Sequence, residues 1–206
     1  MEGFLWQGTH HVIAITETLL SPTFFELGHT MPADLDEPTV RAVHRAVADF
    51  LAAIGLTEGP THTEVRVTPD GPRILESHNR IGGERIHELM QMAFGVDITR
   101  MTVAVPLGLE PMPQLPTPRQ HGAAMKHLLP TPGRVVEISG VDRLPTADPT
   151  LRIRIGVGVG TEVGAVTDGV SRDAVASYVL ASGPTAAAAE QRCAEVLSTV
   201  RITTCV

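Results

Sequence analysis

The stretch from His62 to Leu89, HTEVRVTPDGPRILESHNRIGGERIHEL, constrains the fold of this chain more than any other segment. Val65 alternates with polar neighbours, which is the period of a half-buried strand. Pro69-Asp70-Gly71 is typical of a tight turn, so the chain is expected to fold back on itself there. The stretch therefore predicts a β-hairpin, with Ile74 and Glu76 on one face of its second strand.

Two acids and two histidines are spaced two residues apart on the two predicted strands. His62 and Glu64 share one face of the first strand, and Glu76 and His78 share one face of the second. If the register sets both faces on the same side, the four side chains converge. Carboxylates suit magnesium or manganese, and added imidazoles shift the preference towards manganese, iron or zinc. The pattern predicts Glu64, Glu76 and His78 as metal ligands, and His62 as a catalytic residue.

Basic residues and glycines surround this predicted cluster. Arg80 and Arg66 are candidate catalytic residues, because a guanidinium grips a carboxylate or phosphate with two parallel hydrogen bonds. Asn79, Gly82 and Gly83 are candidate substrate-binding residues, since the backbone comes close to a ligand at glycine. The alternative is a solvated hairpin with ordinary surface charges.

The run P-D-G-P-R-I-L-E-S-H-N-R-I-G-G after E-V-R-V resembles the carboxy-terminal half of an ATP-grasp domain. The resemblance is closest to carboxylate–amine ligases of the L-amino-acid ligase type. In that family two acids on adjacent strands hold magnesium against the nucleotide phosphates, and a following arginine steadies an acyl-phosphate. Glu64 and Glu76 match the acids, and Arg80 matches the arginine. His78 stands where the family often has asparagine, and Asn79 follows one residue later.

A second segment carries the same resemblance. Residues 17–32 include F-F-E-L-G-H-T-M-P, similar to a family strand and turn beside the active-site cleft. The resemblance implies that Glu26 and His29 are substrate-binding residues. A polar strand end before a turn is the alternative interpretation.

Apolar periodicity predicts helices around this hairpin. Residues 36–54 carry apolar side chains at three- and four-residue steps, and Asp36 is suited to cap them. Residues 84–94 form a second predicted helix, whose first N–H groups are expected to face a bound carboxylate or phosphate. Residues 98–107 form a third.

Four prolines between Pro111 and Pro118 predict a linker, because proline at that density fits neither a helix nor a central strand. Beyond it come short β-rich runs and a helix over 185–198, which resemble the extra domain of L-amino-acid ligases. We therefore predict an ATP-grasp-like domain at 1–108, a linker at 109–119 and a ligase C-terminal-like domain at 120–206. The fold class is α/β (α+β): a truncated antiparallel sheet with flanking helices, then a small β-rich domain.

Composition excludes several classes of protein. The net charge is −7, and no basic patch with interleaved aromatic residues indicates nucleic-acid binding. No apolar run is long enough to span a membrane, and no signal peptide is recognised, so a cytoplasmic protein is expected. Cys193 and Cys205 are too few for a disulfide framework.

The resemblance implies the C-terminal portion of a ligase that forms an amide from an amino-acid carboxylate and an amine through an acyl-phosphate. It resembles that family without its N-terminal domain or its lysine-bearing lid, and Lys126 is the sole lysine. ATP is thus expected only if a partner supplies the rest of the site, as a second copy or another chain. The alternatives are an ATP-independent metalloenzyme acting on a small carboxylate at the His62/Glu64/Glu76/His78 site, and a non-catalytic binding or assembly subunit.

Overall fold

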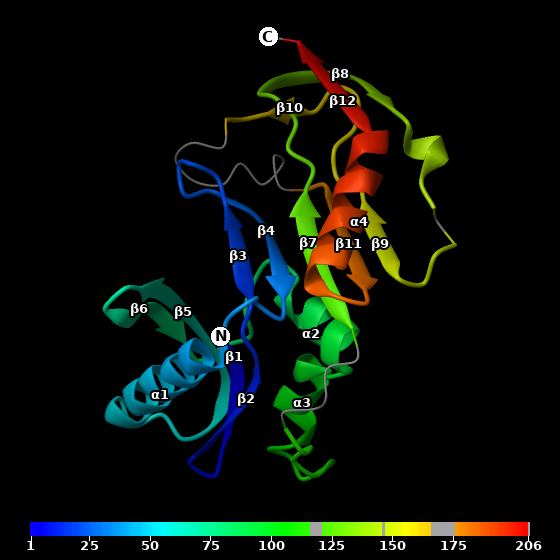
Figure 1. Ribbon diagram of the computed structural model, residues 1–206. Coiled ribbons are helices and arrows are strands. Elements are labelled where there is room, and N and C mark those ends of the chain that lie inside the picture. The colour runs from blue at the N-terminus through cyan, green and yellow to red at the C-terminus, as the bar shows by residue number, and fades with distance from the viewer. Residues whose placement is uncertain (116–120, 146, 166–175, 206) are drawn as a thin grey trace. The chain divides into compact units, whose positions relative to one another are not determined.

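The computed structural model describes residues 1–115, 121–145, 147–165 and 176–205, in two compact units. The first unit is built from Met1–Glu17 and Met31–Gln120, and the second from Thr18–Thr30 and His121–Val206. Both combine β-sheets with helices (Figure 1), which confirms the predicted α/β (α+β) class. The boundaries near 108 and 120 stay a prediction, and residues 116–119 of the proposed linker lie outside the described residues.

The first unit contains a four-stranded antiparallel sheet in the order β2-β1-β5-β6. Its strands are β1 (Glu2–Trp6), β2 (Thr9–Ala14), β5 (Gly59–Thr68) and β6 (Gly71–His78). The predicted hairpin is therefore β5 and β6, joined at the Pro-Asp-Gly turn. Strand β1 lies between β2 and β5 and joins the two hairpins into one sheet.

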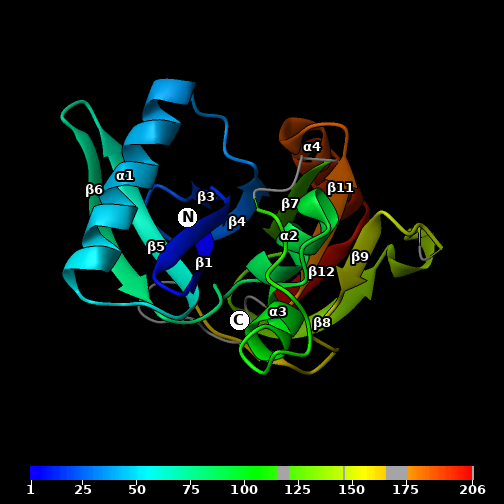
Figure 2. The ribbon, with the colours of Figure 1, turned by 90° about the horizontal axis from the view of Figure 1, so that it is seen from below.

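Helix α1 (Glu37–Ala53) covers one face of this sheet (Figure 2). Asp36 caps it as predicted, accepting a hydrogen bond of 2.9 Å from the backbone N–H of Thr39. The buried side chains of the helix pack against Leu5 of β1 and Val65 of β5. Residues that alternate with Leu5 and Val65 along these strands therefore point to the opposite face, which carries the candidate site.

The pairing of β5 with β6 contains a bulge that the sequence did not predict. Glu64 pairs with Glu76, but the next residue, Val65, pairs with Ile74, so Leu75 is the extra residue. Directly paired residues share a face, and the prediction that Ile74 and Glu76 share one is therefore wrong. The bulge leaves Ile74 on the side of α1 and Glu76 on the opposite side.

Two short helices follow the hairpin. They are α2 (Ile86–Phe94) and α3 (Ile98–Ala104), and both are shorter than predicted. Glu84 and Arg85 have φ angles of 43° and 63°, so the chain makes a left-handed turn before α2 begins. Leu89 and Met90 of α2 are fully buried, as their helical spacing predicts.

The second unit contains a five-stranded sheet in the order β3-β4-β7-β11-β9 and a three-stranded sheet in the order β10-β8-β12. The larger sheet comprises β3 (Glu17–Leu20), β4 (Glu26–Met31), β7 (Gly122–His127), β9 (Leu151–Arg154) and β11 (Tyr178–Gly183). The smaller comprises β8 (Gly133–Ser139), β10 (Glu162–Val163) and β12 (Arg201–Cys205), and a 3-10 turn spans Val141–Arg143. Helix α4 (Ala186–Thr199) packs on β7 and β11 through buried Cys193 and Ala189.

Candidate functional site

The candidate site lies on the face of the first unit's sheet that points away from α1. Three pairs face each other across β5 and β6: His62 with His78, Glu64 with Glu76, and Arg66 with Arg73. Facing residues in an antiparallel ladder have Cβ atoms about 4.5–5.5 Å apart and point to the same side. The structure thus brings together the two acids and two histidines that the sequence singled out, while their chemical roles stay predictions.

Each of the two acids has its own histidine. Nε2 of His78 donates a 2.9 Å hydrogen bond to Oε1 of Glu76, and Nε2 of His62 lies 3.6 Å from Oε1 of Glu64. The two imidazole rings stack, with centroids 6.2 Å apart and planes inclined by 11°. The histidines offset the repulsion between the neighbouring carboxylates, which is otherwise destabilising for like charges placed opposite each other.

The surroundings of Glu76 favour its ionised form. The hydrogen bond from His78 lowers the pKa of the Glu76 carboxyl, and the positive charges of His78, His62 and Arg80 add to this effect. Half of the Glu76 side chain is exposed, and Glu64 is similarly open at 40%. Two neighbouring carboxylates at an accessible surface are suited to bind a cation.

Glu2 is a member of this cluster that the sequence analysis missed. It lies on β1 opposite His62, and both its carboxylate oxygens are near Nδ1 of His62, at 3.0 and 3.1 Å. Burial alone lowers the pKa of His62, but the hydrogen bond to Glu2 and its negative charge outweigh burial and raise it. The available signal was an acid within the apolar run MEGFLW, where only a buried partner makes a carboxylate tolerable.

The glycine pair after the hairpin lies against the same cluster at one position only. A Cβ on Gly82 would be 2.9 Å from Nδ1 of His62 and 3.0 Å from Oε2 of Glu2, whereas one on Gly83 would meet nothing within 4 Å. Gly82 is therefore buried beside the Glu2–His62 pair, and Gly83 is exposed. A substrate-binding role for either glycine stays a prediction.

Arg80 and Asn79 leave β6 in an exposed segment. Nη1 of Arg80 donates to the carbonyl of Ile81 at 3.0 Å, and the charge of Arg80 acts on Glu76. The amide nitrogen of Asn79 donates to the backbone carbonyls of Glu58 and Pro60, at 3.1 and 3.0 Å. These bonds tie the end of β6 to the start of β5, so the Asn79 amide donors are already engaged in structure.

The remaining predicted residues are Arg66 on the hairpin and two residues of the second unit. Arg66 is exposed on β5, on the same face as the acids but beyond the bulge. Glu26 and His29 lie on β4 in the second unit, where Nε2 of His29 is 3.7 Å from Oε2 of Glu26. Nδ1 of the buried His29 also pairs with the hydroxyl of Thr18 at 3.3 Å. The hairpin cluster as described therefore consists of first-unit residues.

The start of α2 has fewer free N–H groups than were predicted. The backbone N–H of Ile86 donates to the backbone carbonyl of Gly83 at 2.9 Å, and the backbone N–H of Glu88 donates to the backbone carbonyl of Arg85 at 2.9 Å. The left-handed turn at residues 84 and 85 makes these bonds possible. These two N–H groups of the first turn of α2 are therefore engaged within the chain, and an anion-binding role for this helix end stays a prediction.

The donor set fits a magnesium-like cation. Among the described residues, no three His, Cys, Asp or Glu side chains are arranged to hold a metal ion. Magnesium commonly takes one or two protein carboxylates and completes its shell with water and substrate phosphates. Glu64 and Glu76 supply that pair, while Nε2 of His78 is engaged with Glu76.

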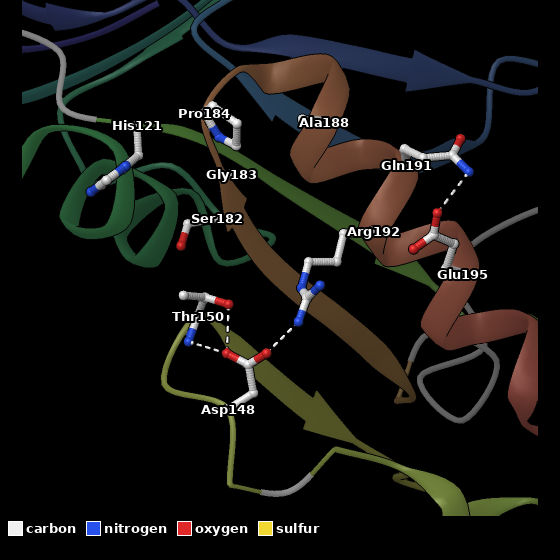
Figure 3. Close-up of a pocket in the computed structure, with 10 residues that line it drawn as sticks. All are labelled: His121, Asp148, Thr150, Ser182, Gly183, Pro184, Ala188, Gln191, Arg192 and Glu195. Carbon is white, nitrogen blue, oxygen red and sulfur yellow. Dashed lines mark hydrogen bonds and ion pairs between the residues drawn. The ribbon is translucent and has the colours of Figure 1, made fainter.

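The second unit contains a cavity of about 750 Å³, along α4 and the end of β11 (Figure 3). Asp148 accepts hydrogen bonds from the backbone N–H and hydroxyl of Thr150, at 2.8 and 2.6 Å, and forms an ion pair with Arg192 of α4. Both oxygens of Asp148 are thus engaged, and the contacts fasten the loop before β9 to α4.

Comparison with known proteins identifies two families along the chain. Residues 1–88 match the family model described as ATP-grasp domain, and residues 126–204 match L-amino acid ligase C-terminal domain 2. The amino-terminal part of the chain is thus similar to an ATP-grasp domain, and the carboxy-terminal part is similar to a domain of L-amino acid ligases. Both matches agree with the resemblance to the carboxy-terminal half of an L-amino-acid ligase that the sequence analysis described.

Individual relatives agree with this assignment. Carnosine synthase 1 of Gallus gallus is 34% identical over 116 residues, which are 56% of this chain and 12% of that protein. Alanine--anticapsin ligase of Bacillus subtilis (strain 168) is 27% identical over 106 residues, 51% of this chain and 22% of that protein. The solved L-amino acid ligase from Bacillus licheniformis superposes with a TM-score of 0.83 at 22% identity, covering 100% of this chain and 51% of that one.

These relatives are considerably longer than the region they share with this chain. The chain spans less than a quarter of either curated relative and about half of the solved ligase.

Among the described residues, no helix combines the length and apolar character needed to cross a membrane.

Proposed function

We propose that this chain supplies the cation- and acyl-binding half of an ATP-dependent ligase that joins an amino-acid carboxylate to an amine. The observation that carries this proposal is the register of β5 and β6, which sets Glu64 directly opposite Glu76, with Arg80 four residues further along. The match to an ATP-grasp domain over residues 1–88 supports it, since this region includes both acids and the arginine.

The two acids would hold a divalent cation, magnesium or manganese, which neutralises phosphate charge when bound. Glu64 and Glu76 face each other across β5 and β6, and the hydrogen bond from His78 lowers the pKa of the Glu76 carboxyl. Arg80 would bind the anionic acyl group, because its guanidinium has five donors and the described contacts engage one of them.

In the proposed reaction a carboxylate oxygen attacks the terminal phosphorus of ATP, and ADP leaves. The amine then attacks the carbonyl carbon of the resulting acyl-phosphate, an amide bond forms, and inorganic phosphate departs with the bonding electron pair. The amine loses a proton in this step. The chain's residues act by holding charge and orientation, which is the main protein contribution to phosphoryl transfer.

Nucleotide contacts are expected to come largely from residues outside this chain, either in the same polypeptide or in a partner. The relatives' greater length supports this expectation. A second candidate function is an ATP-independent metalloenzyme, which the stacked His62–His78 pair beside the acids favours. In that case the imidazoles would ligate the metal directly and would leave their present carboxylate partners.

Manganese binding tests the proposal. We expect Glu76→Gln to weaken Mn²⁺ binding, measured by electron paramagnetic resonance, by about tenfold, or about 1.4 kcal/mol, because one of two charged ligands is lost. Its melting curve in metal-free buffer should stay close to that of the parent. Glu37→Gln is a matched control, since Glu37 is an exposed acid on α1 that pairs with Arg41.

Three results would count against the proposal. Unchanged Mn²⁺ affinity in Glu76→Gln removes the acid pair as the cation site. A large loss of stability in metal-free buffer marks Glu76 as structural. Tight zinc or iron binding that is lost in His78→Gln, together with no response to ATP when the complete ligase is assembled, favours the metalloenzyme instead.

A further inference from the structure

The buried carboxylate of Glu2 has no role in the proposed chemistry, yet it contacts His62, which lies beside Glu64 and stacks on His78. Its side chain is 2% exposed, deeper than either Glu64 or Glu76. A carboxylate at that depth is costly unless it is paired and hydrogen-bonded. Its contact with Nδ1 of His62 is therefore an important part of what makes it tolerable in β1.

The geometry of this contact determines how the His62 ring is oriented. Both oxygens of Glu2 lie within 3.1 Å of Nδ1, and a carboxylate can only accept, so Nδ1 carries the hydrogen and donates it. The other ring nitrogen, Nε2, is then directed towards Glu64. A carboxylate that fixes a histidine in this way is a recurring device behind metal sites.

The His62 ring also contacts a second histidine. It stacks on His78, whose Nε2 donates to Glu76. One ring thus contacts, directly or through one neighbour, both acids of the proposed cation site. If the His62 ring turned, Glu64 would lose its neighbouring imidazole and His78 would lose the surface on which it stacks.

We propose that Glu2 and His62 are positioning residues. The buried carboxylate of Glu2 orients the His62 imidazole, and this imidazole keeps the side chains of Glu64 and Glu76 in the positions that bind a divalent cation. This inference rests on the proposed function for the cation, while the orienting role itself is a property of the metal-free chain. Neither residue needs to touch substrate.

A substitution at Gly82 tests the Glu2–His62 contact independently. A methyl group at this position would lie 2.9 Å from His62 Nδ1 and 3.0 Å from Glu2 Oε2. The backbone of the segment that carries Arg80 thus packs directly on the Glu2–His62 contact. Gly82→Ala is therefore expected to displace the His62 ring without changing any charge.

The test uses the chain labelled with ¹³C at histidine and glutamate, in metal-free buffer at one fixed pH. The readouts are the NMR resonances of the His78 ring and the Glu64 carboxylate, followed by Mn²⁺ affinity. We expect Glu2→Gln to shift both resonances, although Glu2 touches neither residue, and to weaken Mn²⁺ binding by about three- to tenfold. Gly82→Ala should move the same resonances, and the control Glu37→Gln should leave them in place.

The proposal is overturned if a folded Glu2→Gln variant leaves the His78 and Glu64 resonances at their parent positions. It is also overturned if His62→Gln abolishes Mn²⁺ binding while Glu2→Gln leaves it intact, since His62 would then be a ligand. If Glu2→Gln does not fold, the His78 and Glu64 resonances of Gly82→Ala test the proposal instead. If neither variant folds, the Glu2–His62 pair is purely structural and the proposal is overturned. Absence of Mn²⁺ binding in the parent contradicts the proposed function, whereas the resonances still decide the orienting role.

Discussion

Replacing Gly82 by alanine is expected to destabilise the first unit, because the new methyl group has no room. Its three nearest atoms would be Nδ1 of His62 at 2.9 Å, Oε2 of Glu2 at 3.0 Å and Cδ1 of Ile86 at 3.0 Å. A flexible side chain could yield at that distance. His62, however, is held between Glu2 and the stacked ring of His78, so it cannot move without breaking a contact.

The magnitude follows from two opposing effects. Overpacking a tight site typically costs about 1–3 kcal/mol. Replacing glycine by alanine also restricts the unfolded chain, which stabilises the protein by about 0.4–1 kcal/mol. The net loss for Gly82→Ala is therefore about 1–2 kcal/mol, and with a urea m-value of about 1–2 kcal/mol/M the midpoint should fall by about 1 M.

Fluorescence of Trp6 measures this loss in the correct unit. It is the only tryptophan in the sequence and lies on β1 of the first unit. Gly83→Ala is the matched control, since its methyl group would meet nothing within 4 Å. We expect that control to be as stable as the parent or slightly more so. Equal midpoints for Gly82→Ala and Gly83→Ala would refute the packing described around His62 and Glu2.

Two further predictions concern titratable groups. Burial lowers the pKa of His10 to about 4, with the charges of His44 and His11 adding to the effect. The folded state thus binds fewer protons at His10 than the unfolded state. The contribution of neutral His10 to the free energy of unfolding is therefore fully present above about pH 6.5 and is lost as the pH falls towards 4. The urea midpoint should drop between pH 7 and 4.5, and a His10→Gln variant that showed the same drop would contradict this origin. Burial likewise raises the pKa of Cys193 to about 12, whereas Cys205 is exposed. A thiol reagent such as dithionitrobenzoate should therefore titrate one thiol in the native protein and two in urea, and rapid native reaction of both would show that Cys193 is accessible.

The hairpin could be predicted because its signals are local. A turn of proline, aspartate and glycine separates two runs, and the side-chain period of two places His62 and Glu64 together. The bulge at Leu75 could not be predicted in the same way. The run Ile74-Leu75-Glu76 has adjacent apolar residues, so it offers no alternation that distinguishes a regular strand from one with an extra residue.

Other features depend on partners that are distant in sequence. Glu2 meets His62 across 60 residues, and nothing near Glu2 in the sequence indicates that partner. Asn79 next to Arg80 resembled a binding residue, but its amide bonds to carbonyls 19 and 21 residues earlier. The start of α2 was misplaced because Glu84 and Arg85 adopt a left-handed conformation that glycine normally supplies.

The central claim is that Glu64 and Glu76 together hold a divalent cation. Crystals of the protein soaked in Mn²⁺, with diffraction data collected near the manganese absorption edge, test it directly. We expect an anomalous difference peak between the two carboxylates, within about 2.0–2.4 Å of an oxygen of each, and no such peak in Glu76→Gln crystals. A peak at the His62 and His78 nitrogens away from the acids, or an ordered site elsewhere with none at Glu64 and Glu76, would contradict it.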